Sequence, residues 1–96
     1  MIASKKPVSF PVGQLVATPM ALSALTEAGQ SPIEFLSRHH HGDWGDVCRE
    51  DWGLNDEAVT DGTRILSSYR TAKNVKIWII TEADRSSTCI LLPEEY

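Results

Sequence analysis

The sequence predicts an α+β domain in which an N-terminal short strand and two to three helices pack on a C-terminal antiparallel meander of three to four strands. Residues 75–96 contain two strand-like runs, KIWIITE and TCILLPEEY, which the polar residues 83–87 join as in a β-hairpin. Residues 64–70 alternate between two faces as a third strand does. Residues 18–41 instead carry two helix-start signals, so helices come first in the chain and strands last.

The run KIWIITE has apolar side chains at both odd and even positions, so we expect both faces of this strand to be buried. We therefore predict that residues 76–82 form the central strand, with residues 64–70 on one side and residues 88–92 on the other. Trp78 lies in the middle of this strand and should be largely buried.

The length of 96 residues suits one domain with one core. We expect residues 1–11 to form a flexible N-terminal tail and residues 12–96 to form a single α+β domain that begins with a short edge strand at 12–17. No stretch approaches the run of about 20 apolar residues that spans a membrane, and the start lacks the apolar run of a signal peptide, so we expect a cytoplasmic location. The two cysteines match neither a disulfide framework nor a CxxC metal site.

Two short helices follow the first strand. Thr18 is the predicted N-cap of the first helix because a proline follows it at the first helical position, and Gly29 ends that helix. Ser31 and Glu34 have the spacing of a capping box, which begins the second helix, and Gly42 is its natural stop.

Residues 46–61 have a helical pattern. Cys48, Trp52, Asn55 and Val59 recur at steps of four, three and four, so they form one stripe. A glycine in the middle of this segment leaves open whether it forms one helix or two.

The stretch HHHGDWGD, residues 39–46, has two interpretations. Histidine and aspartate bind metals and move protons, which suggests a metal or catalytic site. Adjacent histidines point in different directions on a helix, however, whereas metal-binding pairs sit at i and i+4. We therefore predict a structural corner without metal or cofactor, in which Trp44 fills the core, Asp43 and Asp46 accept bonds from nearby amides, and the Asn55 side chain bonds to the corner backbone.

Charge is unevenly distributed along the chain, and this is the main clue to partners. Residues 43–61 contain seven acidic residues and one basic residue, a net charge of −6, whereas residues 62–81 contain four basic residues and no acidic one. A solvated helix face and a protected sheet edge explain this pattern without function. A functional explanation is an acidic protein-binding surface. Its expected residues are Asp43, Trp44, Asp46, Glu50, Asp51 and Glu57. Another is a basic site for nucleic-acid phosphates. Its expected residues are Arg64, Arg70, Lys73, Lys76 and Arg85.

The motifs HGDWGD (41–46), WIITEADR (78–85) and LLPEEY (91–96) together resemble a family of small, largely uncharacterised bacterial and plasmid-borne proteins. Some of its members carry the name of a type I restriction subunit M. The resemblance covers roughly residues 12–96. Because so short a chain has no room for a methyltransferase domain and lacks its motifs, the resemblance implies a mobile-element setting and no particular chemistry. The order of helices followed by a meander is also similar to the barnase and RelE group of small ribonucleases, a similarity of topology alone.

These observations favour a small acidic interaction protein without enzymatic activity, which binds a protein partner such as a host-defence or regulatory complex. The alternative is a metal-independent endoribonuclease toxin. In that case Glu82 or His41 would take the proton of the 2′-hydroxyl, and Arg64 or Arg85 would stabilise the phosphorane. The net charge of −4 favours the interaction protein because RNA is itself an anion.

Overall fold

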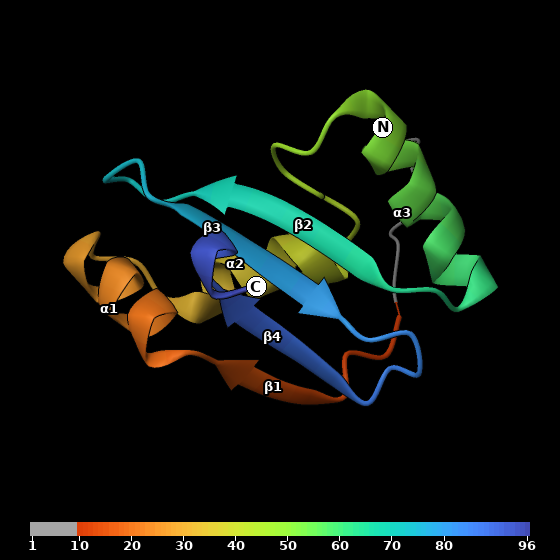
Figure 1. Cartoon of the computed structure of the whole chain (residues 1–96), viewed down its shortest axis with the longest axis horizontal. Coiled ribbons are helices and arrows are strands. Elements are labelled where there is room, and N and C mark those ends of the chain that lie inside the picture. The colour runs from red at the N-terminus through yellow and green to blue at the C-terminus, as the bar shows by residue number, and fades with distance from the viewer. Residues whose placement is uncertain (1–9) are drawn as a thin grey trace, which may run out of the picture.

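The computed structural model describes residues 10–96, and its architecture is α+β, as the sequence predicts (Figure 1). The helices and strands, in chain order, are β1 (Gln14–Ala17), α1 (Pro19–Glu27), α2 (Pro32–His40), α3 (Arg49–Asp61), β2 (Ile65–Arg70), β3 (Lys76–Thr81), β4 (Ser87–Leu91) and the short 3-10 helix η1 (Pro93–Glu95). None of the helices within residues 10–96 has the length and apolar composition that crossing a bilayer requires.

The four strands form one mixed sheet in the order β1-β4-β3-β2. β3 pairs antiparallel with β2 on one side and with β4 on the other, which confirms the predicted meander and its central strand. Asn74 in the first turn and Arg85 in the second have left-handed backbones, with φ of 65° and 62°. The predicted N-terminal edge strand also forms, and it joins the sheet by pairing parallel to β4.

The predicted caps begin both short helices. The hydroxyl of Thr18 accepts from the amide of Ala21 at 3.1 Å, and that of Ser31 accepts from the amide of Ile33 at 3.3 Å. The reciprocal half of the expected capping box does not form, because the Glu34 carboxylate accepts instead from the side chain of Gln30, at 2.9 Å. α2 crosses behind the sheet in Figure 1, so one sheet face is covered by a helix.

Two clusters of buried apolar side chains make up the core. The larger lies between α1, α2 and the sheet. Its members are Ala21, Ala24, Leu25, Phe35, Tyr69, Ile77, Ile79, Ile90 and Leu92. The smaller joins α3 and the corner before it to β2, and consists of Phe10, Trp44, Ala58 and Ile65. Phe10 is only 4% exposed, so the predicted tail is wrong at this position and the folded domain includes it. Residues 1–9 of that tail lie outside the described residues.

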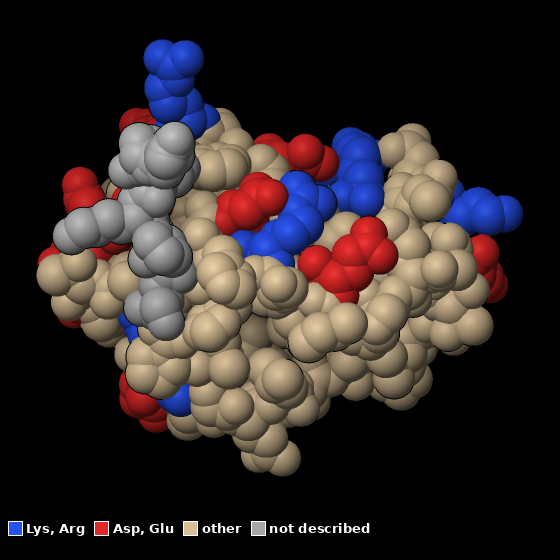
Figure 2. Space-filling model, turned by 180° about the vertical axis from the view of Figure 1, so that it is seen from behind, with Lys and Arg blue, Asp and Glu red and all other residues tan. Residues whose placement is uncertain are grey.

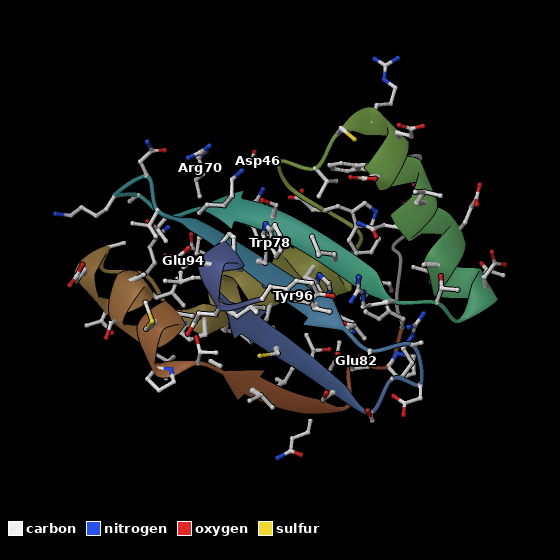
Figure 3. The ribbon with its side chains drawn as sticks, viewed as in Figure 1. Asp46, Arg70, Trp78, Glu82, Glu94 and Tyr96 are labelled. Carbon is white, nitrogen blue, oxygen red and sulfur yellow. The ribbon has the colours of Figure 1, made fainter. Side chains whose placement is uncertain are left out.

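Trp78 is partly exposed, so the prediction that both faces of this strand are buried holds less completely at Trp78 than at its neighbours Ile77 and Ile79. Successive side chains of a strand point to opposite faces, and Ile77 and Ile79 take the fully buried positions on the helix side. Trp78 lies on the other face, where its main aromatic neighbour is Tyr96, with ring centroids 5.8 Å apart (Figure 3). That face is therefore covered mainly by the C-terminal turn at η1.

Candidate functional site

Within the predicted helical segment 46–61, residues 49–61 form one continuous helix, α3, so this segment contains one helix and not two. Gly53 is exposed and does not interrupt it, and Gly62, with φ of 76°, ends it in a left-handed conformation. Glu50 and Asp51 lie in the first turn, where the helix dipole favours negative charge. Cys48 precedes the helix as an exposed N-cap, so it does not belong to the helical stripe that was predicted to include it.

Asn55 attaches α3 to the outer edge of β2. Its side-chain nitrogen donates to the carbonyl of Leu66 at 2.7 Å, and its oxygen accepts from the amide of Leu66 at 3.3 Å. The predicted partner, the backbone of the 42–45 corner, is therefore wrong. Because β2 runs between β3 and α3, the outward backbone groups of Leu66 are the nearer partners for this amide.

The corner before α3 continues the same attachment. Trp44 is fully buried, as predicted, and its indole N–H donates to Asp56 at 2.9 Å. The Trp44 carbonyl accepts from the amide of Ser68 at 3.1 Å, and the amide of Asp46 donates to the Ser68 carbonyl at 2.6 Å. Gly45 must be glycine here, since its φ is 77° and a Cβ would collide with the Ser68 carbonyl. The corner therefore acts as a short additional strand beside β2.

Some of the predicted binding residues serve the fold. Asp43 accepts from Arg38 at 2.8 Å and from the amide of Gly45 at 3.1 Å, as expected of a corner carboxylate. Asp46 lies 3.7 Å from Arg70, and both side chains are about half exposed. Trp44 has no surface to offer a partner because it is fully buried.

The remaining predicted binding residues, Glu50, Asp51 and Glu57, lie exposed on α3. Leu54 is on the same side of the helix, 59% exposed, one turn from both Glu50 and Glu57. The ion pairs within residues 10–96 are Arg38 with Asp43 and Arg70 with Asp46, so none of these three carboxylates has a cationic partner there. Leu54 is not among the predicted binding residues, although its place between acidic residues on a helical wheel is a usable signal.

A groove of about 280 Å³ runs between α3 and β2, beside the side of α3 that carries Glu50, Leu54 and Glu57. Its lining consists of Val47, Asp51, Leu54, Asn55, Arg64 and Leu66. The helix side of the groove thus carries a carboxylate and the sheet side carries a guanidinium, with leucines between them. We call this groove, together with Glu50 and Glu57, the α3 site.

The four candidate ribonuclease residues are not assembled. The Arg85 guanidinium donates to the backbone carbonyls of Ala58 and Thr63, at 2.7 and 2.8 Å, so it ties the β3–β4 turn to the end of α3. Arg64 contacts the ring and hydroxyl of Tyr96 on the sheet face opposite α1 and α2. His41 follows α2 on the helix side, where its Nδ1–H donates to a carbonyl of its own helix. Glu82 lies exposed beyond the end of β3 (Figure 3).

The candidate phosphate-binding cations are also divided. Arg70 and Lys76 face each other across β2 and β3, and Lys73 lies in the turn that joins these strands. Arg64 and Arg85 are at the other end of the strands, in the contacts just described. The structure thus brings three of the five cations together.

His39 holds a polar network that sequence reasoning did not single out. It is fully buried, and its two ring nitrogens lie 2.5 Å from the Ser67 hydroxyl and 2.8 Å from the Thr81 hydroxyl. Thr81 in turn contacts Thr88 at 2.7 Å. Burial, with a smaller contribution from the neighbouring His40, lowers the pKa of His39 to about 3, so the ring is neutral. Its spacing of four residues from Phe35 on α2 is the signal that could have identified it as a core residue.

Across residues 10–96, no three His, Cys, Asp or Glu side chains lie close enough together to hold a metal ion. Comparisons with protein-family models, curated proteins and solved structures find no match for this chain.

Proposed function

We propose that the protein is a small, non-enzymatic interaction protein that binds a protein partner through the α3 site. The observation that carries this proposal is Leu54, which is 59% exposed between Glu50 and Glu57 on a helix whose acidic side chains have no cationic partner within residues 10–96. Protein interfaces commonly have an apolar core surrounded by a polar rim, and Leu54 with its acidic neighbours has this arrangement.

The charges of the α3 site define the chemistry of the partner. These carboxylates have no cationic partner within residues 10–96, and their negative potential would speed the approach of a basic surface and orient it. The groove beside them offers Leu54 and Leu66 to an apolar side chain. The expected partner surface is therefore basic, with at least one apolar residue that enters the groove.

The alternative function, a metal-independent endoribonuclease, has weaker support. Its activity needs a base and a cation that face the same phosphate. His41 and Arg64 lie on opposite faces of the sheet, and the Arg85 guanidinium is bound to backbone carbonyls. The resemblance of residues 41–46 and 78–96 to the mobile-element family supplies the setting of the proposal, a bacterial cytoplasm in which the partner is a defence or regulatory protein.

Site-specific photo-cross-linking in bacterial cells tests the proposal. A photoreactive residue in place of Leu54 should form a discrete protein adduct, whereas the same residue at Met20, which is 51% exposed on α1, should not. Reversal of Glu50, Asp51 and Glu57 to lysine should remove the adduct and leave the fold intact, because exposed charges contribute little to stability. The adduct should also decrease with added salt in a cell lysate.

Two results would contradict the proposal. One is an identical set of adducts from positions 54 and 20, which would mean nonspecific contact. The other is RNA cleavage by the purified protein that disappears in Glu82→Gln, which would establish the ribonuclease instead.

A further inference from the structure

The outer edge of β1 pairs with no strand of residues 10–96. The amides of Gln14 and Thr18 donate to carbonyl oxygens of the β4 segment, both at 3.0 Å. Because backbone groups alternate in direction along a strand, the N–H and C=O groups of Leu15 and Ala17 point away from β4. Such a row of free groups is a template for another strand.

Apart from its short length, β1 lacks the features that usually protect an edge. Its four residues, QLVA, contain neither a charge nor a proline. Leu15 is 50% exposed and Val16 is 44% exposed, on opposite faces of the strand. Edge strands of monomeric proteins commonly carry lysine, proline or a bulge to prevent pairing. β1 is therefore suited to contact with another strand.

An apolar groove of about 200 Å³ accompanies this edge, between β1 and α2. Val12 and Leu15 line it on the strand side, and Ile33 and Leu36 line it on the helix side. Ile33 is 63% exposed and lies next to the other apolar side chains of this groove. Contiguous exposed apolar side chains of this kind often mark an interaction surface. Figure 2 shows the molecule from behind, and the lower centre of this view, on the side of β1, carries no charged side chain.

We propose that β1 is the pairing edge of a two-fold symmetric homodimer. In this dimer the two β1 strands run antiparallel around Val16, so that Leu15 of each copy exchanges both backbone hydrogen bonds with Ala17 of the other. The two sheets then form one continuous sheet of eight strands.

The structure favours a second copy over an unrelated partner for two reasons. First, the edge is self-complementary, because an antiparallel two-fold axis places each outward donor opposite an acceptor. Second, the charges suit it: β1 is uncharged, and the acidic helix α3 lies beside β2 at the far edge of the sheet (Figure 1). Within residues 10–96, the two β1 strands therefore meet without like charges, whereas a charged partner strand would find no counter-charge on β1.

The helices contribute to the same interface. A two-fold axis perpendicular to the sheet keeps both α2 helices on one face of the joined sheet. Ile33 and Leu36 of each copy then lie along the seam, where they can cover the groove of the other copy. Burial of these side chains adds apolar contact to the four hydrogen bonds of the strands.

Sedimentation equilibrium of the full chain tests the dimer. We expect a mass that rises with concentration from 10.6 kDa toward twice that value. Leu15→Lys and Ile33→Lys should each keep the chain monomeric over the same range, since both place a desolvated charge at the seam. Met20→Lys is the matched control, because Met20 is equally exposed but lies in a different hollow with Val75. Leu54→Lys, in the α3 site, should also leave the dimer unchanged, which separates this proposal from the proposed function.

Two NMR measurements identify the interface directly. In the dimer the amides of Leu15 and Ala17 should exchange with solvent at least tenfold more slowly than in Leu15→Lys, and a sample that mixes labelled and unlabelled chains should show contacts between the Val16 side chains of the two copies. Circular dichroism and the amide spectrum verify that each variant is folded. A wild-type chain that stays monomeric up to millimolar concentration overturns the proposal, as does a dimer that survives both lysine variants.

Discussion

The two edges of the sheet differ in whether their outward backbone groups have hydrogen-bond partners within residues 10–96. At β2, the outward backbone groups of Leu66 bond to the Asn55 side chain, and those of Ser68 bond to the backbone of Trp44 and Asp46. At β1, no segment of residues 10–96 takes the equivalent position. A helix and the corner before it thus cover the β2 edge, whereas the β1 edge is a short, uncharged strand. The acidic region is therefore in part a structural cover. Within residues 10–96, two separate surfaces are left for partners: the exposed side of α3 that carries Glu50, Leu54 and Glu57, and the outer edge of β1.

The largest loss of stability should come from a substitution at the β2 edge, which the corner and α3 cover. Trp44→Ala removes a fully buried side chain that packs with Phe10 and Ile65, so it should lower the free energy of unfolding by about 3–5 kcal/mol. Trp78→Ala is the matched control, because Trp78 is only half-buried, and we expect a loss of roughly 1–3 kcal/mol. Urea unfolding monitored by circular dichroism measures both. Equal losses would mean that the corner contributes no more to the domain than the C-terminal turn does.

The next effect is a pH dependence that comes from His39, which connects α2 to β2 and β3. Its pKa is about 3 in the folded protein and near 6.5 when unfolded, so the unfolded chain binds more protons between these values. Stability should therefore be complete above pH 6.5 and fall as the pH drops toward 3, by about 2–4 kcal/mol from this group. Urea unfolding at several pH values measures the slope.

His39→Gln isolates this contribution, because it removes the titrating ring while carboxylates elsewhere still titrate. Its stability should depend less on pH between 6.5 and 3 than that of the wild type. An unchanged slope in His39→Gln would show that the buried ring does not resist protonation.

The hydrogen bonds between Asn55 and Leu66 at the β2 edge should contribute less to stability. Asn55→Ala leaves the N–H and C=O of Leu66 without their partner, so we expect a loss of about 1–3 kcal/mol. Amide exchange at Leu66 should accelerate more than at Ile65, whose backbone groups face β3. Thr60→Ala, at an exposed position on the same helix, is the control and should change little. Unaltered exchange at Leu66 would mean that Asn55 does not seal this edge.

What the sequence predicts correctly is local. The caps at Thr18 and Ser31 depend on neighbouring residues, and the meander joins strands that are adjacent in the chain. The errors concern contacts between distant segments. Phe10 packs against residues from the middle of the chain, and the Asn55 side chain bonds to Leu66 of the following strand instead of the corner backbone.

The candidate site follows the same rule. Glu50, Asp51 and Glu57 are exposed on one helix, and helical periodicity alone is enough to group them. Periodicity cannot say that Asn55 meets Leu66 instead of the corner, because both choices satisfy a buried amide equally well. Nor can it say that β1 lies parallel to β4, since the pairing joins residues more than 70 positions apart, from Gln14 to Ser87.

The smallest expected effect concerns the open edge, and it depends on concentration. In dilute solution, where the chain is monomeric, Leu15→Lys should change the free energy of unfolding by less than about 0.5 kcal/mol, because half of this side chain is already in water and the strand's bonds to β4 do not use the Leu15 amide. At high concentration the wild type should gain stability by association, since a dimer that forms only between folded chains shifts the unfolding equilibrium. The melting temperature of the wild type should therefore rise with concentration, while that of Leu15→Lys should stay constant. Scanning calorimetry over a wide concentration range measures this difference. A melting temperature that rises equally in both proteins would place any association elsewhere, and the two edges would then differ in structure without differing in function.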